Sequence, residues 1–267
     1  MTGYAESRSF INIAGHRLEA LTIGDVTSSA PTLVFLHAGL GSLDLWKEYP
    51  SKLVERTGFG ALVYSRYGYG RSDSLSEKRS VNYLHHEGQE VLPEILDAFE
   101  ISRPILIGHS DGATIALLFA AAFPSRPCAI ILEAPHIFVE DITLAGLREA
   151  KEAYENGPLR NALQPHHIDA ETTFRGWNDI WLNPEFRDWN IEAELKTIAC
   201  PVLLIQGEDD QYGTMAQLEG IRRQVPGAEL HMIQQCRHSP HQDQPDIVLE
   251  HMVRFIKDLG VSSEYQE

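Results

Sequence analysis

Apolar residues follow two patterns along this chain of 267 residues, and the two patterns alternate. Short, nearly uninterrupted apolar runs are typical of strands buried on both faces of a sheet. Longer segments with apolar residues every three or four positions indicate helices. Strands are predicted at 9–13, 17–23, 32–36, 60–64, 105–108, 129–134, 201–206 and 229–233. Helices are predicted at 45–56, 81–99, 113–123, 214–224 and 245–259.

The order of these elements predicts the fold class. Only a short turn with one glycine separates the first two strands, so we expect them to form an antiparallel hairpin. The later strands alternate with helices, which is typical of parallel strands covered by helices on both faces. We therefore expect an α/β protein with an eight-stranded, mostly parallel sheet.

The alternation stops between residues 136 and 196. This stretch has helix-like segments and no strand signal, and it is rich in large aromatic residues, namely Phe174, Trp177, Trp181, Phe186 and Trp189. We expect an inserted helical cap at 136–196 and an α/β core formed by residues 1–135 and 197–267. Trp177 and Trp181 are four residues apart and would share one face of a helix. They are predicted either to line a substrate pocket together or to form the core of the cap.

Charge and cysteine content exclude several classes of function. The chain has 22 Lys and Arg against 38 Asp and Glu, and its net charge of −16 opposes binding to nucleic acid. Three cysteines without C-x-x-C spacing argue against a disulfide framework and a zinc site. No window approaches the length of an apolar membrane span, and the first residues lack the features of a secretory signal. We expect a cytoplasmic protein without a bound metal.

A serine stands between a predicted strand and a predicted helix. Residues 108–112 read Gly-His-Ser-Asp-Gly and fit the G-x-S-x-G pattern, in which small flanking residues allow a sharp turn that exposes the serine hydroxyl. Ser110 is the candidate nucleophile. A histidine must accept the proton of such a hydroxyl, and a carboxylate must hold that histidine in the correct tautomer.

The later strand ends supply both of these groups. The carboxyl ends of parallel strands meet at one edge of a sheet, where function gathers in open α/β folds. His238 follows the last strand and is the candidate base, with His241 as a weaker rival. Asp210 follows the strand at 201–206 and is the candidate acid, with Asp209 as the second choice. The chain order serine, carboxylate, histidine is the one that accompanies this turn elsewhere.

Two backbone N–H groups are candidates for an oxyanion hole. Gly39 lies in a glycine-containing loop after the third strand, and Asp111 begins the helix that follows Ser110. Both N–H groups would reach the negative oxygen that develops when Ser110 attacks a carbonyl. His37, at the start of the same loop, is expected to be structural.

With these motifs in place, the chain resembles the α/β-hydrolase fold superfamily from about residue 9 to residue 259. The motifs are the loop His37-Ala38-Gly39, the turn at 108–112, Gly207-x-x-Asp210 and His238-Ser239-Pro240. The resemblance implies that Ser110, Asp210 and His238 carry catalysis, that the Gly39 and Asp111 amides stabilise the oxyanion, and that no cofactor is needed.

Three positions depart from the usual pattern of that superfamily. Ala38 and Arg237 stand where glycine is common, which restricts the two loops. Asp111 places a carboxylate directly after the nucleophile, where it either caps the helix N-terminus or opposes an anionic transition state.

These observations predict a serine hydrolase, most simply a carboxylesterase acting on a small or medium-sized ester through an acyl-enzyme on Ser110. A thioesterase, a lactonase and a hydrolase of carbon–carbon bonds would use the same three residues and stay open as alternatives. A ligand receptor that keeps the hydrolase pocket without catalysis is the alternative from another class.

Overall fold

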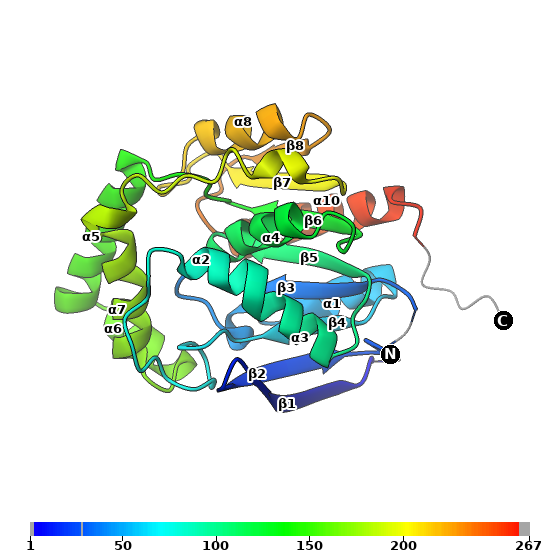
Figure 1. Ribbon diagram of the computed structural model, residues 1–267, viewed down its shortest axis with the longest axis horizontal. Helices are drawn as coiled ribbons and strands as arrows, with labels where there is room; N and C mark the ends of the chain where they lie inside the picture. Colours follow the sequence, from blue (N-terminus) through cyan, green and yellow to red (C-terminus); the bar gives the residue numbers. More distant parts are fainter. Residues whose placement is uncertain (1–2, 28, 262–267) are drawn as a thin grey trace.

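A computed structural model describes residues 3–27 and 29–261, and these residues form one eight-stranded sheet (Figure 1). The strand order is β1-β2-β4-β3-β5-β6-β7-β8. β1 and β2 form an antiparallel hairpin, β2 is antiparallel to β4, and the remaining neighbours are parallel. The strands are β1 Glu6–Ile13, β2 His16–Ile23, β3 Thr32–Leu36, β4 Ala61–Tyr64, β5 Pro104–His109, β6 Ala129–Glu133, β7 Val202–Gly207 and β8 Glu229–Ile233. The predicted fold class is confirmed.

Helices cover both faces of the sheet because alternate residues of the central strands point in opposite directions. Leu106 of β5 belongs to one apolar cluster with α3 (Leu92–Ala98), α4 (Asp111–Ala122) and α8 (Met215–Gln224). Ile105 and Ile107 belong to a second cluster with α1 (Tyr49–Thr57) and α10 (Pro245–Asp258). The central strands read as continuous apolar runs because both of their faces are buried.

Two predicted helices are interrupted, and each interruption lies near a proline. The helix expected at 45–56 is a short 3₁₀ turn, Leu43–Trp46, followed by α1, which has Pro50 in its first turn. The helix expected at 81–99 consists of α2 (Tyr83–His86), a π turn at Glu87–Val91, and α3 with Pro93 in its first turn. Proline has no N–H to donate to the preceding turn, so a regular helix cannot run through it.

The segment between β6 and β7 is helical, as expected for residues 136–196. It contains α5 (Asp141–Asn156), α6 (Leu159–Leu163) and α7 (Ala170–Trp181), which lie together beside the sheet at the left of Figure 1. Phe174, Trp181 and Phe186 belong to the same apolar cluster as β5 and α4, so the segment shares one hydrophobic core with that face of the sheet. No helix in the described part of the chain has the length and apolarity needed to cross a bilayer.

Candidate active site

Ser110 lies on a sharp turn between β5 and α4. Its φ of 54° and ψ of −116° are rare for a residue with a side chain and place it between the last residue of the strand and the first of the helix. A Cβ atom at Gly108 would collide with the backbone of Gly112, and one at Gly112 would collide with the carbonyl of Leu36. Glycine at both positions therefore lets the turn close tightly around Ser110.

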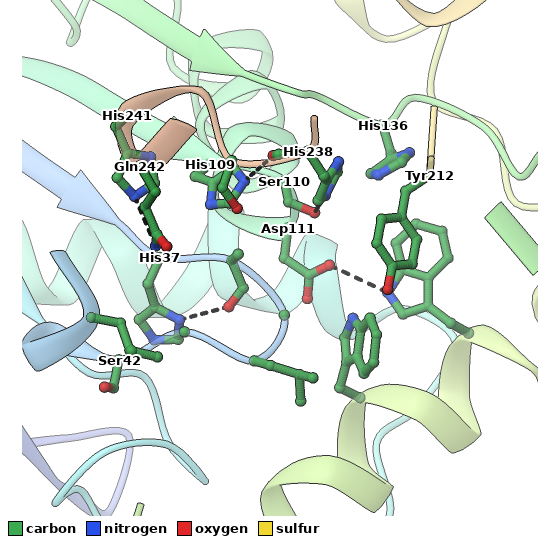
Figure 2. A pocket seen from close by; sticks show the side chains of 18 of the residues that line it. His37, Ser42, His109, Ser110, Asp111, His136, Tyr212, His238, His241 and Gln242 are labelled. Carbon is green, nitrogen blue, oxygen red and sulfur yellow. Dashed lines mark hydrogen bonds between the residues drawn. The ribbon is translucent and has the colours of Figure 1, made fainter. Parts of the chain in front are cut away.

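Ser110, His238 and Asp210 form one hydrogen-bonded chain at the carboxyl edge of the sheet. Figure 2 shows Ser110 and His238 side by side in the cavity. His238 Nε2 lies 3.0 Å from Ser110 Oγ, and His238 Nδ1 lies 2.9 Å from both carboxylate oxygens of Asp210. The carboxylate also accepts hydrogen bonds from the Tyr212 backbone N–H (2.8 Å) and from the Gln206 amide (2.7 Å). The structure thus brings Asp210, the first choice of the sequence analysis, against His238.

The surroundings of Asp210 keep it ionised. Burial alone would raise the pKa of this carboxyl, but the hydrogen bonds and charge of His238 and the Tyr212 N–H lower the pKa below its ordinary value. An ionised carboxylate accepts hydrogen bonds only, so His238 carries a proton on Nδ1 and offers the Nε2 lone pair to the Ser110 hydroxyl. This is the tautomer that a general base for serine requires.

A buried arginine holds the loop that carries Gly39. Arg66 is fully buried, and its guanidinium donates to the carbonyls of His37 (3.2 Å) and Ala38 (3.0 Å). The Arg66 backbone N–H donates to His37 Nε2 (3.0 Å), while His37 Nδ1 donates to the Ala38 carbonyl (2.8 Å). Burial, together with the charge of Arg66, lowers the pKa of His37 well below its ordinary value, so its ring is neutral. His37 therefore has a structural place in the loop.

The loop positions that depart from the usual pattern fit without strain. Neither Ala38 nor Arg237 is among the described residues with positive φ, so each adopts a conformation open to any side chain. Gly39 cannot be replaced in the same way, because a Cβ atom there would collide with the Trp177 indole. The N–H of Asp111, as the first residue of α4, has no acceptor within the helix.

The Asp111 carboxylate is buried and has partners from three directions. Tyr83 Oη donates to it at 2.9 Å and Trp181 Nε1 at 3.3 Å, and the Arg66 guanidinium lies 3.7 Å away. Its negative charge is therefore balanced by Arg66 beside the nucleophile. Trp181 Nε1 also donates to Tyr83 Oη (2.8 Å), which connects α7 to α2 and to the residue after Ser110.

A cavity of about 210 Å³ opens over Ser110. The loops at the strand ends form its floor, and α5 and α7 form part of its wall through Thr143, Leu147, Trp177 and Trp181. Trp177 is 9% exposed and Trp181 is 2% exposed. Both indoles line the cavity and are also packed in the core, so the two alternatives set by the sequence coexist.

Residues 33–251 match the sequence profile described as the alpha/beta hydrolase family, which is most of the chain. The chain belongs to the alpha/beta hydrolase family. The predicted resemblance is confirmed, and Ser110, Asp210 and His238 lie inside the matched region.

The chain shares about a quarter of its residues or fewer with the relatives described next. The human serine hydrolase BPHL is 24% identical over 68% of this chain, and the match spans 64% of the human protein. A 2-hydroxy-6-oxononadienedioate/2-hydroxy-6-oxononatrienedioate hydrolase of Comamonas testosteroni is 22% identical over 77% of this chain and 80% of its own. The crystal structure of the enol-lactonase from Burkholderia xenovorans LB400 superimposes with a TM-score of 0.73 at 18% identity, covering 93% of this chain and all of that one. The structural likeness shows the shared fold.

Several residues of this hydrolase-family site escaped the sequence analysis. Arg66, Tyr83 and Glu133 are buried and polar, and each contacts a predicted site residue from a distant part of the chain. His241, the rival base, pairs with Glu133 rather than with Ser110, its Nδ1 lying 2.9 Å from Glu133 Oε2. A polar residue inside or directly after an otherwise apolar strand, as at Glu133 and Arg66, is the one sequence signal that could have drawn attention to them.

Proposed function

We propose that the protein is a serine hydrolase that cleaves a carboxylic ester of a small or medium-sized substrate. The observation that carries this proposal is the hydrogen-bonded chain from Ser110 through His238 to Asp210 at the floor of the cavity. Membership of the alpha/beta hydrolase family supports hydrolysis as the reaction class. Ester cleavage is the simplest reaction that such a chain performs without a cofactor.

The reaction proceeds in two steps. His238 Nε2 accepts the hydroxyl proton while Ser110 Oγ attacks the ester carbonyl, and the negative oxygen of the tetrahedral intermediate is stabilised by the N–H groups of Gly39 and Asp111. His238 then gives the proton to the departing alcohol, which leaves an acyl group on Ser110. A water molecule activated by His238 releases the acid in the second step. Asp210 stabilises the imidazolium in both steps.

The helical segment 136–196 acts as a cap that selects the substrate. It contributes no member of the chain Ser110–His238–Asp210, but its helices α5 and α7 supply apolar walls to the cavity. Trp177 and Trp181 define the space available beside Ser110. The core at 1–135 and 197–267 therefore carries the chemistry, and the cap sets the shape of the substrate.

Labelling with a fluorophosphonate probe tests the proposal at its first step. The probe phosphonylates a serine that a histidine activates, so we expect the mass of the peptide with Ser110 to increase in the wild type and to stay unchanged in Ser110→Ala. Absence of labelling in the wild type contradicts a serine hydrolase and favours a ligand receptor on the same fold.

A substrate panel then separates the reaction classes. We expect short and medium p-nitrophenyl esters to be turned over with higher kcat/KM than matched thioesters, lactones and vinylogous diketones. Faster turnover of a lactone or a diketone would leave the roles of Ser110 and His238 unchanged. The substrate would then be a lactone or a diketone rather than an open-chain ester.

A further inference from the structure

A second histidine–carboxylate pair lies at the edge of the cavity, three residues after His238. Glu133, the last residue of β6, is fully buried, and His241 is 6% exposed. Glu133 Oε2 accepts hydrogen bonds from the backbone N–H and from Nδ1 of His241, both at 2.9 Å. The Ser110 N–H donates to the Glu133 carbonyl at 2.9 Å, so the pair is anchored beside the nucleophile without contacting its hydroxyl.

The pair fixes which nitrogen of neutral His241 is the hydrogen-bond acceptor. Because a carboxylate only accepts, the proton of neutral His241 lies on Nδ1, and Nε2 presents a lone pair. In this tautomer Nε2 accepts a long hydrogen bond of 3.4 Å from the Gln242 amide, which a closer donor on a substrate would replace, and both residues line the cavity. His241 Nε2 is therefore a hydrogen-bond acceptor at the cavity wall, held in orientation by a buried carboxylate.

The charges around the cavity favour donors and oppose anions. None of the described side chains that line it is a lysine or an arginine. The carboxylate of Asp111 lies 3.7 Å from the Arg66 guanidinium, and the carboxylate of Glu133 lies 2.9 Å from the His241 imidazole. The chain as a whole carries a net charge of −16. A second negative group in this cavity would meet like charges without a cation to pair with.

His241 and Gln242 lie on the side of Ser110 opposite to His136 and Tyr212 (Figure 2). An ester attacked by Ser110 extends in two directions, one for its acyl half and one for its alcohol half. One half would face the side of Tyr212 and the cap tryptophans, and the other would face His241.

We propose that His241 Nε2 accepts a hydrogen bond from a hydroxyl or ammonium group on the substrate, so that the protein selects esters bearing such a donor over esters bearing a carboxylate. This inference rests on the proposed ester hydrolysis and names the substrate class of the same site. The donor is recognised by the lone pair that the Glu133–His241 pair orients. The described cavity lining includes the Asp111 carboxylate and no lysine or arginine, which favours an ammonium group over a carboxylate.

Two matched series of esters test this subsite in the purified wild type. One series is methyl phenylacetate with a para hydrogen, hydroxyl, methoxy, aminomethyl or carboxylate group, and the other is benzyl acetate with the same substituents. The two series place the group on the acyl half or on the alcohol half, so one of them reaches His241 in either orientation. In that series we expect kcat/KM for the hydroxyl ester to exceed that of the methoxy ester by about tenfold, the value of one good hydrogen bond. The carboxylate ester is expected to be slower by about 100-fold.

Variants assign the effect to the pair. His241→Phe removes the acceptor, and the ratio of hydroxyl to methoxy turnover is expected to fall to about one. Glu133→Gln keeps an oxygen for the two His241 hydrogen bonds and removes the charge, so the aminomethyl preference falls more than the hydroxyl preference. His231→Phe is the matched control, because His231 forms a similar pair with Glu229 (2.6 Å) at a distance from the cavity, and it leaves all ratios unchanged.

The outcomes separate the subsite from the reaction. Equal wild-type kcat/KM for hydroxyl and methoxy esters in both series, with Ser110 labelled by the fluorophosphonate probe, overturns the subsite and leaves the hydrolase in place. Absence of both labelling and turnover overturns ester hydrolysis. Calorimetric titration of Ser110→Ala with the same esters then still measures the donor preference, and equal affinities overturn the subsite as well. If circular dichroism shows that His241→Phe does not fold, the ester series in the wild type and in Glu133→Gln test the subsite instead.

Discussion

The carboxyl edge of the sheet and the helical segment 136–196 contribute to the same cavity in different ways. The edge places Ser110, Asp210 and His238 after β5, β7 and β8 and joins them by hydrogen bonds of 2.9 to 3.0 Å. The helical segment adds apolar walls, and one of its polar links to the nucleophile region runs from Trp181 to Tyr83 and Asp111. Strand pairing determines the positions of these three side chains, whereas side-chain packing determines the shape of the cavity beside them.

This difference between the two regions predicts which kinetic property a substitution in each region changes. The rate of a reaction depends steeply on the positions of the reacting groups, since a misplacement of about 1 Å can cost about 10²-fold. An apolar wall discriminates between substrates by only about 1–3 kcal/mol per methylene group. Changes at the edge should therefore alter the rate for every substrate, and changes in the helical segment should alter which substrate is preferred.

The largest effect is expected at the nucleophile. Ser110→Ala should lower kcat/KM for p-nitrophenyl acetate by at least about 10³-fold, because the three residues act as a unit. Steady-state kinetics measure the loss, and circular dichroism checks that the fold is retained. A variant that keeps more than about a tenth of the activity contradicts the role assigned to Ser110.

A smaller loss, still of at least about 10²-fold, is expected for Asp210→Asn. The asparagine amide donates to His238 Nδ1 and favours the tautomer whose Nε2 cannot accept the serine proton. Asp209→Asn is the neighbouring control, because the Asp209 backbone N–H donates to the Cys236 carbonyl and its carboxylate is not part of the described contacts of His238. Equal losses for the two variants would move the acid to Asp209.

Substitution in the helical segment should change selectivity by about tenfold. Trp177→Ala enlarges the cavity, so the ratio of kcat/KM for a hexanoate to that for an acetate ester should rise, with kcat for acetate nearly unchanged. Because Trp177 is also buried, the free energy of unfolding should fall by about 3–5 kcal/mol. Trp189→Ala is the control, since Trp189 packs on Phe186 (5.2 Å between ring centroids) outside the cavity lining. An unchanged ester profile in Trp177→Ala would make Trp177 a core residue only.

The smallest effect is a pH dependence at the border between the two regions. Burial lowers the pKa of His136 from its ordinary value of 6.5 to about 3. Between these two values the unfolded chain binds more protons than the folded one, so stability falls as the pH is lowered through this window. His136→Gln should reduce that slope by about 1.4 kcal/mol per pH unit. Urea unfolding at pH 7, 6 and 5 measures how the free energy of unfolding depends on pH. The same dependence in the wild type and in His136→Gln would contradict the lowered pKa of His136.

Much of the fold could be predicted from the sequence, because buried parallel strands appear as apolar runs. β3 and β8 have the predicted bounds, and the other strands differ from the prediction by a few residues. Ser110, Asp210 and His238 could be found for the same reason, since each follows an apolar run that ends at the functional edge of the sheet. The interruption of the helix at 81–99 was missed, although Pro93 marks it.

The rest of the site depends on contacts that leave no local pattern. Glu133 and His241 are 108 residues apart in the chain, and Tyr83 and Trp181 are 98 apart. Each of these polar groups is favourable only because its partner is buried beside it, and a single sequence contains no spacing that pairs them. Arg66 illustrates the same difficulty. Its hydrogen bond to the His37 carbonyl requires β3 and β4 to be neighbours in the sheet, and the sequence near Arg66 does not indicate that pairing.

The tryptophans have a consequence of another kind. The chain contains four, and Trp46, Trp177 and Trp181 line the cavity, while Trp189 lies 5.9 Å from Trp181 between ring centroids. The tryptophan fluorescence of the protein should therefore depend mainly on the surroundings of this cavity. A molecule that enters the cavity changes the polarity around these indoles, so emission intensity and wavelength report occupancy in real time. Binding to the cavity should therefore be measurable from intrinsic tryptophan fluorescence, without an added dye.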